Sequence, residues 1–313
     1  MTASTANILI AAKLLPYLQQ RLQEQFRCHL LDDMDEVGLA AIAPAIRGIA
    51  CRGETKITRD VITRFPALQI ISVFGVGYDG VDVDAARERG IAVTHTPDVL
   101  TDDVADLAMG LLLASARQIV RADAFTRSGA WSKGPYALST KVSGAKLGIV
   151  GLGRIGRAIA RRAAAFGMTI AYHNRKPQPD VSYRYVPELK TLAAEVDFLV
   201  LAMPGGAGTS ALINTEVLQA LGAQGFLINV ARGSVVDQEA LIQALQEGSI
   251  AGAGLDVFAN EPQIPEALAA LDNVVLTPHI ASGTMATRVA MADLAFDNLN
   301  ACLSGKPLLT PVP

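Results

Sequence analysis

The stretch KLGIVGLGRIGRAIARRAAAFGMTIAYHNR, residues 146–175, decides the fold of this chain. It opens with a short apolar run at 147–150, which is typical of a strand buried on both faces of a sheet. A helical pattern follows at 154–166, and a second apolar run follows at 168–172. This order predicts the strand–turn–helix–strand unit from which parallel α/β sheets are built.

Three glycines join the first strand to the helix in G-x-G-x-x-G spacing: Gly151, Gly153 and Gly156. In such a motif the first glycine makes the tight turn and the second lets a pyrophosphate approach the backbone. The third lets helix and strand pack closely. N–H groups at the helix N-terminus then attract the phosphates. Because both strands and the helix flank the glycines, the motif predicts a dinucleotide site rather than a turn of structural use alone.

Length and composition indicate a compact globular protein. The 313 residues suffice for two domains with separate cores, and 50% of them are hydrophobic against 18% charged. A net charge of −3 gives no global attraction to nucleic acid or to an anionic membrane, so we expect neither as a partner. The three cysteines, Cys28, Cys51 and Cys302, match no metal or redox spacing. We therefore expect no metal site and reduced thiols in the cytoplasm.

The N-terminus lacks the basic flank and apolar core of a signal peptide. The most apolar long segment, 104–120, carries Asp106 and Arg117, and so fits a buried helix better than a membrane span.

Residues 7–94 alternate between apolar runs and helical patterns, which predicts a parallel sheet with helices on both faces. Thr96-Pro97-Asp98 breaks this pattern and indicates a crossing between domains. A long helix is expected from 99 to about 119, then a polar helical stretch to 129. The irregular segment 129–143 carries Trp131, and fits either a dimer arm or a surface loop with one buried aromatic.

A second sheet is expected from residue 146 onward, followed by a helix at 284–303 that returns to the first domain. The later strands of this second sheet are expected at 182–186, 198–202, 225–229, 250–254 and 273–276. The fold class is thus α/β, with two doubly wound parallel-sheet domains. Residues 1–97 and 284–313 should form the substrate-binding domain, and residues 98–283 the dinucleotide-binding domain.

Polar side chains follow three buried strands of the second sheet. Arg232 follows FLINVA, Asp256 follows AGAGL and His279 follows VVLTP, while Glu261 lies five residues beyond Asp256. Carboxyl ends of parallel strands meet at one edge, so these groups should share the rim of the glycine loop. A histidine beside a carboxylate suits a proton donor, and an arginine holds a carboxylate bidentately. Each alone fits a solvated or structural residue, but together they predict reduction of a 2-oxo acid beside a nicotinamide.

A second glycine turn, Phe74-Gly75-Val76-Gly77-Tyr78-Asp79-Gly80, follows a buried strand of the first domain. Its backbone N–H groups could bind an anion at the carboxyl end of the sheet. A glycine turn of purely structural use explains it equally well, and both interpretations stay open.

The end of the second strand predicts the cofactor. An NAD-selective site places an acidic residue about 20 residues past the glycine turn, where it accepts from the ribose 2′-OH. Here that position holds Asn174, and Arg175 and Lys176 follow. Loss of the carboxylate and gain of two cations favour a 2′-phosphate, so NADPH should be preferred over NADH. The alternative is a solvated pair in a turn before Pro177.

Several segments resemble the D-isomer-specific 2-hydroxyacid dehydrogenase family, and the resemblance covers nearly the whole chain. They are TPDVLTDDVADLAMGLLLA, GIVGLGRIG, INVARGSVVD, GAGLDVFANEP and LTPHIAS. The ending SGKPLLTPV, with GVGYD and HNRK, is similar to the glyoxylate/hydroxypyruvate and hydroxyphenylpyruvate reductase branch. The resemblance implies a Rossmann-like coenzyme domain, a flavodoxin-like substrate domain, an active site in the cleft between them, and a homodimer built around the helices after Val99.

The resemblance also implies a role for each matching residue. The catalytic arginine, carboxylate and acid–base histidine fall on Arg232, Glu261 and His279. Phosphate-binding positions fall on Leu152, Gly153, Arg154 and Ile155. Nicotinamide contacts fall on Val230, Ala231 and Asp256, and the substrate-carboxylate loop falls on Val76 and Gly77.

Two alternatives stay open beside a reductase of glyoxylate, hydroxypyruvate or hydroxyphenylpyruvate. One is a phosphoglycerate dehydrogenase-type NAD enzyme, although many of those carry a further C-terminal regulatory domain. The other is a non-enzymatic dinucleotide sensor, since transcriptional corepressors share this fold.

Overall fold

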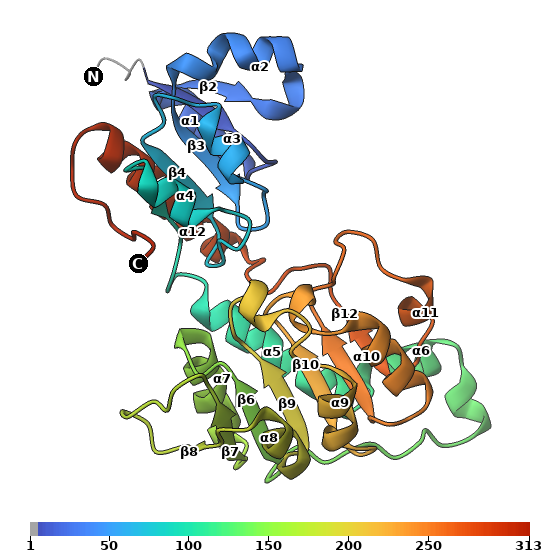
Figure 1. The fold of residues 1–313 in the computed structure, drawn as a ribbon. Coiled ribbons are helices and arrows are strands. Elements are labelled where there is room, and N and C mark those ends of the chain that lie inside the picture. The colour runs from blue at the N-terminus through green and yellow to red at the C-terminus, as the bar shows by residue number, and fades with distance from the viewer. Residues whose placement is uncertain (1–5) are drawn as a thin grey trace. The chain divides into compact units, whose positions relative to one another are not determined.

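The computed structural model describes residues 6–313, so the first five residues of the expected unit 1–97 lie outside the described residues. The chain divides into two compact units (Figure 1). One takes the chain up to Leu100 together with Ser282–Pro313, and the other takes Thr101–Ala281. Each unit is built on a parallel sheet, of five and seven strands respectively, which confirms the predicted α/β fold class. The functional roles of the two units stay predictions.

The first unit has the strand order β2-β1-β3-β4-β5. All five residues of β4 are buried, as expected for a strand in a sheet covered on both faces. The helix α12 returns to this sheet, where the Ser72 hydroxyl donates to the Ala295 carbonyl at 3.0 Å. The elements are β1 (Asn7–Ile10), α1 (Pro16–Gln25), β2 (Arg27–Leu30), η1 (Leu31–Asp33), α2 (Glu36–Ile42), η2 (Ala43–Ala45), β3 (Ile46–Arg52), α3 (Arg59–Thr63), β4 (Ile70–Phe74), α4 (Val83–Glu88), β5 (Ala92–Thr94) and α12 (Met285–Leu303).

The second unit has the strand order β12-β11-β10-β9-β6-β7-β8. The chain starts at β6, moves to β7 and β8 on one side, and then builds β9 to β12 on the other. Its elements are α5 (Thr101–Ala116), α6 (Ile119–Arg127), η3 (Ala130–Lys133), β6 (Lys146–Val150), α7 (Arg154–Ala165), β7 (Thr169–His173), β8 (Arg184–Tyr185), α8 (Leu189–Glu195), β9 (Phe198–Leu201), η4 (Ala207–Thr209), α9 (Thr215–Leu221), β10 (Phe226–Asn229), η5 (Gly233–Val235), α10 (Gln238–Gln246), β11 (Gly252–Leu255), α11 (Glu266–Ala269) and β12 (Val274–Leu276).

The order of the seven strands places the glycine loop at a switch point. The loop follows β6, which lies between β9 and β7, where the direction of chain progress reverses. Open α/β sheets bind ligands beyond the carboxyl ends of their strands at such a point. The topology thus supplies the setting that the glycine motif predicts.

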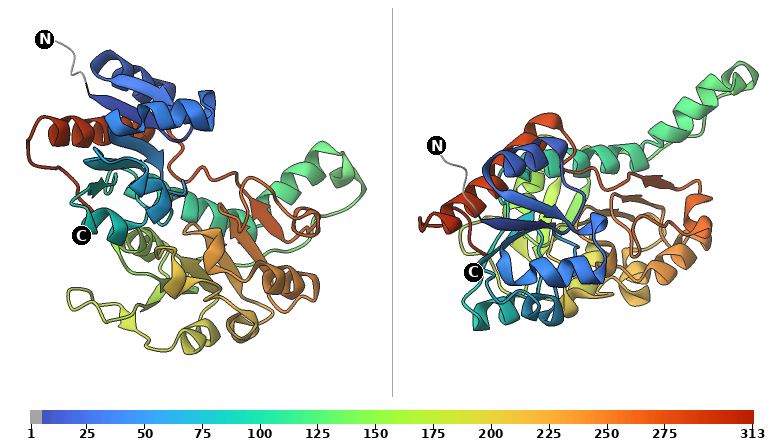
Figure 2. Two further views of the ribbon diagram at one scale, coloured as in Figure 1. Left: turned by 45° about the horizontal axis from the view of Figure 1, so that its top comes forward. Right: turned by 90° about the horizontal axis from the view of Figure 1, so that it is seen from above.

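The structure corrects three expectations. The helix expected to run to about 119 ends at Ala116, because Gln118 adopts a left-handed φ of 53° before α6 begins. The strand expected at 182–186 is only Arg184–Tyr185, at the edge of the sheet. Trp131 is 68% exposed, so a surface loop with a buried aromatic is wrong. The segment holding α6 and η3 projects away from the sheet of its own unit (Figure 2).

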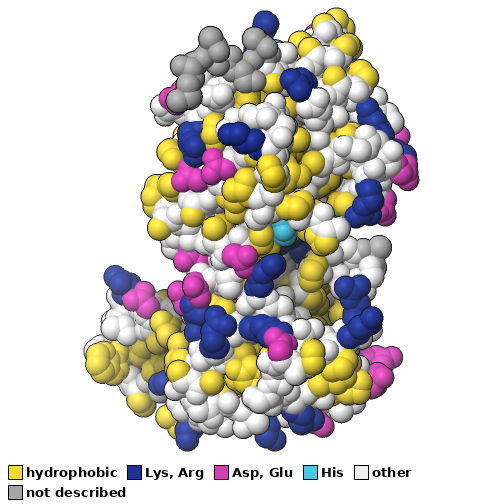
Figure 3. All heavy atoms as spheres, turned by 90° about the vertical axis from the view of Figure 1, so that its left-hand side faces the viewer, with side chains coloured by type: hydrophobic (Ala, Val, Ile, Leu, Met, Phe, Trp, Pro, Cys, Tyr) yellow, Lys and Arg dark blue, Asp and Glu magenta, His cyan; other side chains and the backbone are white. Residues whose placement is uncertain are grey.

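None of the helices within residues 6–313 combines the length and the apolar character that a bilayer crossing requires. On the face that Figure 3 presents, Lys and Arg side chains lie interspersed with Asp and Glu side chains.

Close packing at the glycine turn explains two of its three glycines. Gly151 has a φ of 97°, which side chains rarely permit. A Cβ on Gly156 would lie 2.2 Å from the Gly151 carbonyl oxygen, so α7 can approach the turn only with glycine there. A Cβ on Gly153 would meet no atom within 4 Å. The backbone conformation and close packing thus require glycine at 151 and 156, whereas nothing in the packing requires it at 153.

We predict that Gly156→Ala destabilises the protein and that Gly153→Ala does not. The first substitution forces backbone apart and should cost about 1–3 kcal/mol of unfolding free energy. The second has space and a φ of −84°, which alanine adopts readily. Thermal unfolding of both variants measures the difference. Equal melting temperatures would contradict the packing argument.

Candidate active site

The three polar residues expected on one rim follow neighbouring strands. Arg232, Asp256 and His279 lie beyond the ends of β10, β11 and β12, which are adjacent in the sheet. Because all three strands are parallel, their carboxyl ends face the same edge. The glycine loop after β6 lies on that edge too. The second unit therefore carries the predicted set on one rim.

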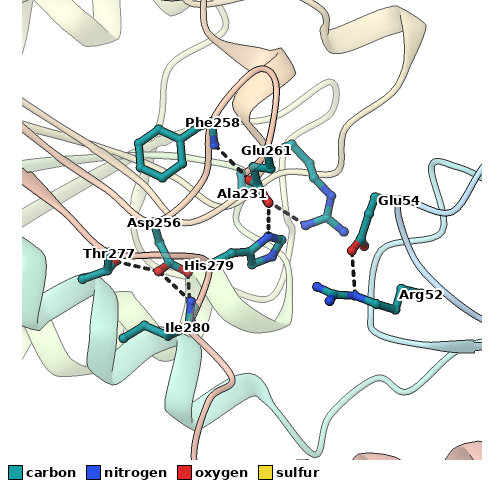
Figure 4. A network of polar contacts seen from close by, with 11 residues as sticks. Arg52, Glu54, Ala231, Asp256, Phe258, Glu261, Thr277, His279 and Ile280 are labelled. Carbon is teal, nitrogen blue, oxygen red and sulfur yellow. Dashed lines mark hydrogen bonds and ion pairs between the residues drawn. The ribbon is translucent and has the colours of Figure 1, made fainter. Parts of the chain in front are cut away.

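Asp256 is fully buried and holds the segment that follows β12. One carboxylate oxygen accepts from the Thr277 hydroxyl at 2.6 Å and from the Ile280 N–H at 2.8 Å (Figure 4). The other accepts from the Ala281 N–H at 2.8 Å. A buried polar group is tolerated when it is hydrogen-bonded in this way. Asp256 thereby fixes the backbone on both sides of His279.

His279 forms a short hydrogen bond with Glu261. Its Nδ1 lies 2.6 Å from Glu261 Oε2, and the two side chains are 29% and 30% exposed. The His279 backbone has a left-handed φ of 53°, and its N–H donates to the carbonyl of Asp256. Such backbone strain in a non-glycine residue persists only where its surroundings enforce it. With Nδ1 engaged by the carboxylate, Nε2 is the nitrogen available for proton exchange with a ligand.

Competing effects set the pKa of Glu261. Burial alone raises it, but hydrogen bonds from His279 and from the Phe258 N–H, with the charges of His279 and Arg232, lower it overall. The carboxylate form is thus favoured in the folded protein. Its contribution to stability is present above the unfolded-state pKa and is lost as pH falls through the lowered pKa of the folded state.

The backbone around Arg232 is fixed by two features that the sequence did not single out. Asn229 is buried at the end of β10, where its side chain accepts from the Ala231 N–H at 3.0 Å and donates to the Arg232 carbonyl at 2.9 Å. A Cβ on Gly233 would lie 1.9 Å from the Phe258 backbone. The glycine therefore brings the Arg232 turn against the turn that ends in Glu261.

The glycine loop is tied to the end of β7. The Leu152 N–H donates to the side-chain oxygen of Asn174 at 2.7 Å. Arg175 and Lys176 are exposed, and neither forms an ion pair with any of residues 6–313. The helix α7 starts with Gly153 as its N-cap, which has no side chain to accept from the first N–H groups. These features fit an anionic diphosphate group at the helix N-terminus.

The other candidate residues fall into two groups. Leu152, Val230 and Ala231 are buried beside the rim of the second unit, and Arg154 and Ile155 open α7. Val76 and Gly77 belong to the first unit, in the loop after β4. Within residues 6–313, no cluster of His, Cys, Asp or Glu side chains is suited to hold a metal ion.

Thr277 was not predicted as part of the site, although it stands two residues before His279 in LTPH. Its hydroxyl is one of the groups that hold the Asp256 carboxylate. Thr277 and Asn229 could have been found from the sequence, because each is a polar residue directly after an apolar run, VVL and FLI respectively.

Comparisons with known proteins agree on one family. The family described as D-isomer specific 2-hydroxyacid dehydrogenase, NAD binding domain, matches residues 109–281. The chain is 47% identical to the hydroxyphenylpyruvate reductase of Plectranthus scutellarioides, over 98% of both chains. It is 46% identical to the 2-ketogluconate reductase of Gluconobacter oxydans, over 99% of both.

A solved structure also matches over almost the full length. It is an NADPH-dependent glyoxylate/hydroxypyruvate reductase from Sinorhizobium meliloti, in complex with NADP and malonate. It is 48% identical and has a TM-score of 0.93, covering 99% of this chain and 97% of that one.

We predict that Asp256→Asn loosens the backbone around His279. The amide nitrogen of asparagine cannot accept the hydrogen bonds that the carboxylate accepts from Thr277, Ile280 and Ala281. Each buried donor left without a partner should cost about 1–3 kcal/mol of unfolding free energy. Hydrogen exchange at Ile280 and Ala281 should accelerate. Asp272→Asn is the matched control, since that side chain is 82% exposed. Unchanged protection in Asp256→Asn would remove the carboxylate from this positioning role.

Proposed function

The chain belongs to the D-isomer-specific 2-hydroxyacid dehydrogenase family, and from that premise we propose that it uses NADPH to reduce glyoxylate, hydroxypyruvate and hydroxyphenylpyruvate to D-2-hydroxy acids. The observation that carries the proposal is the 2.6 Å hydrogen bond between Glu261 and His279, on the same rim as the glycine loop. Family membership already makes it a nicotinamide-dependent oxidoreductase of 2-oxo acids. The substrates and the NADPH preference are the proposed part.

His279 supplies the proton. Glu261 engages Nδ1 and stabilises the imidazolium, so Nε2 donates to the carbonyl oxygen of the substrate. The nicotinamide, when bound, supplies a hydride to the carbonyl carbon. After the transfer His279 is neutral and recovers a proton from solvent before the next turnover.

Arg232 holds the substrate carboxylate. Its guanidinium fork can bind a carboxylate bidentately and place the adjacent carbonyl beside His279. The backbone N–H groups of Val76 and Gly77 are proposed to complete this carboxylate site. Together these groups orient the substrate so that carbon and oxygen receive hydride and proton in the required geometry.

The cofactor is proposed to bind at the start of α7. The diphosphate would accept from the N–H groups of the loop from Gly151 to Gly156, where Gly153 leaves room for close approach. Val230, Ala231 and Asp256 would border the nicotinamide. Arg175 and Lys176 would pair with the 2′-phosphate.

We propose that the chain forms a homodimer through the segment 119–138, which holds α6 and η3. Four large apolar side chains are exposed there, far more than a solvated loop needs. They are Ile119, Val120, Trp131 and Leu138, at 52, 58, 68 and 97% exposure.

A substrate panel tests the proposed function. NADPH oxidation is measured with glyoxylate, hydroxypyruvate, hydroxyphenylpyruvate and 2-ketogluconate, and 3-phosphoglycerate oxidation is measured with NAD. Reduction of the first three is the expected result. Preferred oxidation of 3-phosphoglycerate would indicate the phosphoglycerate dehydrogenase-type NAD enzyme. Cofactor binding without turnover would indicate the non-enzymatic dinucleotide sensor.

We predict that His279→Ala lowers kcat by about 10²–10⁴-fold while cofactor binding survives, because a positioned acid contributes that range. Glu261→Gln removes the charged partner that holds the His279 ring through Nδ1, so it should lower kcat as well. Steady-state rates measure both effects, with the exposed Glu266→Gln as control. Wild-type turnover in His279→Ala would contradict the assignment.

We predict that the unmodified protein prefers NADPH over NADH by roughly 30-fold to several thousand-fold, the range for one desolvated charged pair. Asn174→Asp combined with Arg175→Ala should collapse or invert this preference. Aspartate can still accept from the Leu152 N–H, so the loop geometry should persist. Values of kcat/KM for both cofactors measure the change, and Arg161→Ala, an exposed position on α7, is the control. Comparable values in the wild type would show the interpretation of Asn174 to be wrong.

A further inference from the structure

The loop after β4 is held from one side by two consecutive residues. The Gly75 carbonyl accepts from the Thr96 N–H at 2.8 Å. The Val76 carbonyl lies 2.8 Å from His95 Nδ1. Since a carbonyl only accepts, Nδ1 carries the proton in this hydrogen bond. Residues 95 and 96 thus engage the carbonyls of two consecutive loop residues, Gly75 and Val76.

The engaged carbonyls dictate where the N–H groups point. Both peptide bonds, Gly75–Val76 and Val76–Gly77, are trans. In a planar trans peptide the N–H and the C=O point in opposite directions. The N–H groups of Val76 and Gly77 are therefore directed away from residues 95 and 96. Across the described part of the chain, neither of them donates a hydrogen bond.

His95 is itself held on three sides. Its ring meets the Tyr78 ring edge-on, with centroids 5.4 Å apart and planes at 83°. Its N–H donates to the Thr310 carbonyl at 3.2 Å, and its carbonyl accepts from the Thr310 hydroxyl at 2.6 Å. The C-terminal segment continues this contact, because the Val312 N–H donates to the Val93 carbonyl. Backbone and ring of His95 are thus both fixed.

A buried asparagine anchors the C-terminal segment. Asn298, on α12, is fully buried. Its oxygen accepts from the N–H groups of Leu309 and Thr310, at 3.0 and 3.1 Å. Its nitrogen donates to the Leu294 carbonyl and to the Thr310 hydroxyl, at 2.9 and 2.8 Å. All four hydrogen-bonding positions of this amide are used, which makes the network rigid.

We propose that His95 is a positioning residue: the network from Asn298 through Thr310 to His95 aims the Gly77 N–H at the substrate carboxylate, beside the Val76 N–H that Thr96 orients. This inference rests on the proposed function, which assigns carboxylate binding to that loop. His95 acts through the Val76 peptide and does not touch the substrate. Its loss lets the peptide rotate, which weakens anion binding without changing the proton donor or the cofactor site.

The test compares three variants by two readouts. His95→Ala removes the donor, whereas His95→Asn places an amide N–H near the position of Nδ1. His29→Ala is the matched control, since His29 makes a 2.8 Å hydrogen bond to Asn7 in β1, while its own strand β2 lies at the edge of the sheet opposite β5. The readouts are the KM for glyoxylate and the Kd of oxalate, an unreactive dicarboxylate, in the presence of NADP.

His95→Ala should raise both the glyoxylate KM and the oxalate Kd by roughly 3- to 10-fold, the range for one neutral hydrogen bond. His95→Asn should recover most of this loss, and the NADPH Kd should stay constant in all variants. Values within twofold of wild type in His95→Ala would overturn the inference. An equal loss in His95→Asn, with a lower melting temperature, would show a merely structural role and overturn it too.

The proposed function has its own distinct failure. A wild-type protein that neither reduces any 2-oxo acid nor binds oxalate would overturn the assignment of the loop, and the positioning role with it.

Discussion

The hydrogen bonds that converge on the buried carboxylate of Asp256 are the constraint on which the rest of the site depends. They hold the chain from Thr277 to Ala281 in one conformation, although His279 within it has a left-handed backbone. That conformation brings the imidazole within 2.6 Å of Glu261. Because a carboxylate with three donors is costly to rearrange, the His279–Glu261 pair is set before any ligand binds.

The glycines couple this site to the packing of the sheet. Gly233 lets the turn of Arg232 touch the backbone at Phe258, and Gly156 lets α7 approach the loop at Gly151. In both places the clashing atom is backbone, so a larger residue displaces main chain rather than a flexible side chain. The contacts that form the rim therefore also stabilise the fold, so a substitution that changes the rim geometry should also lower the stability of the protein.

The sequence allowed the fold class and the rim to be predicted, since both follow from patterns along the chain. Arg232, Asp256 and His279 each follow an apolar run, and parallel strands end at a common edge. Contacts between distant segments were beyond reach. The hydrogen bond from Leu152 to Asn174 depends on the pairing of β6 with β7. The hydrogen bond from His95 to Val76 depends on how two loops pack together. The strand expected at 182–186 was too long and the break at Gln118 was missed, because neither 182–186 nor 116–119 contains a Gly or Pro that would mark the end of an element.

We propose that Arg232 and His279 fix the carboxylate and the carbonyl oxygen of a 2-oxo acid. Only one face of the carbonyl carbon can then receive the hydride, so a single enantiomer must form. The most direct measurement is the configuration of the glycerate formed from hydroxypyruvate with NADPH, resolved by chiral chromatography. We expect D-glycerate alone, and L-glycerate or a racemic product would show that Arg232 and His279 do not hold the substrate in this way.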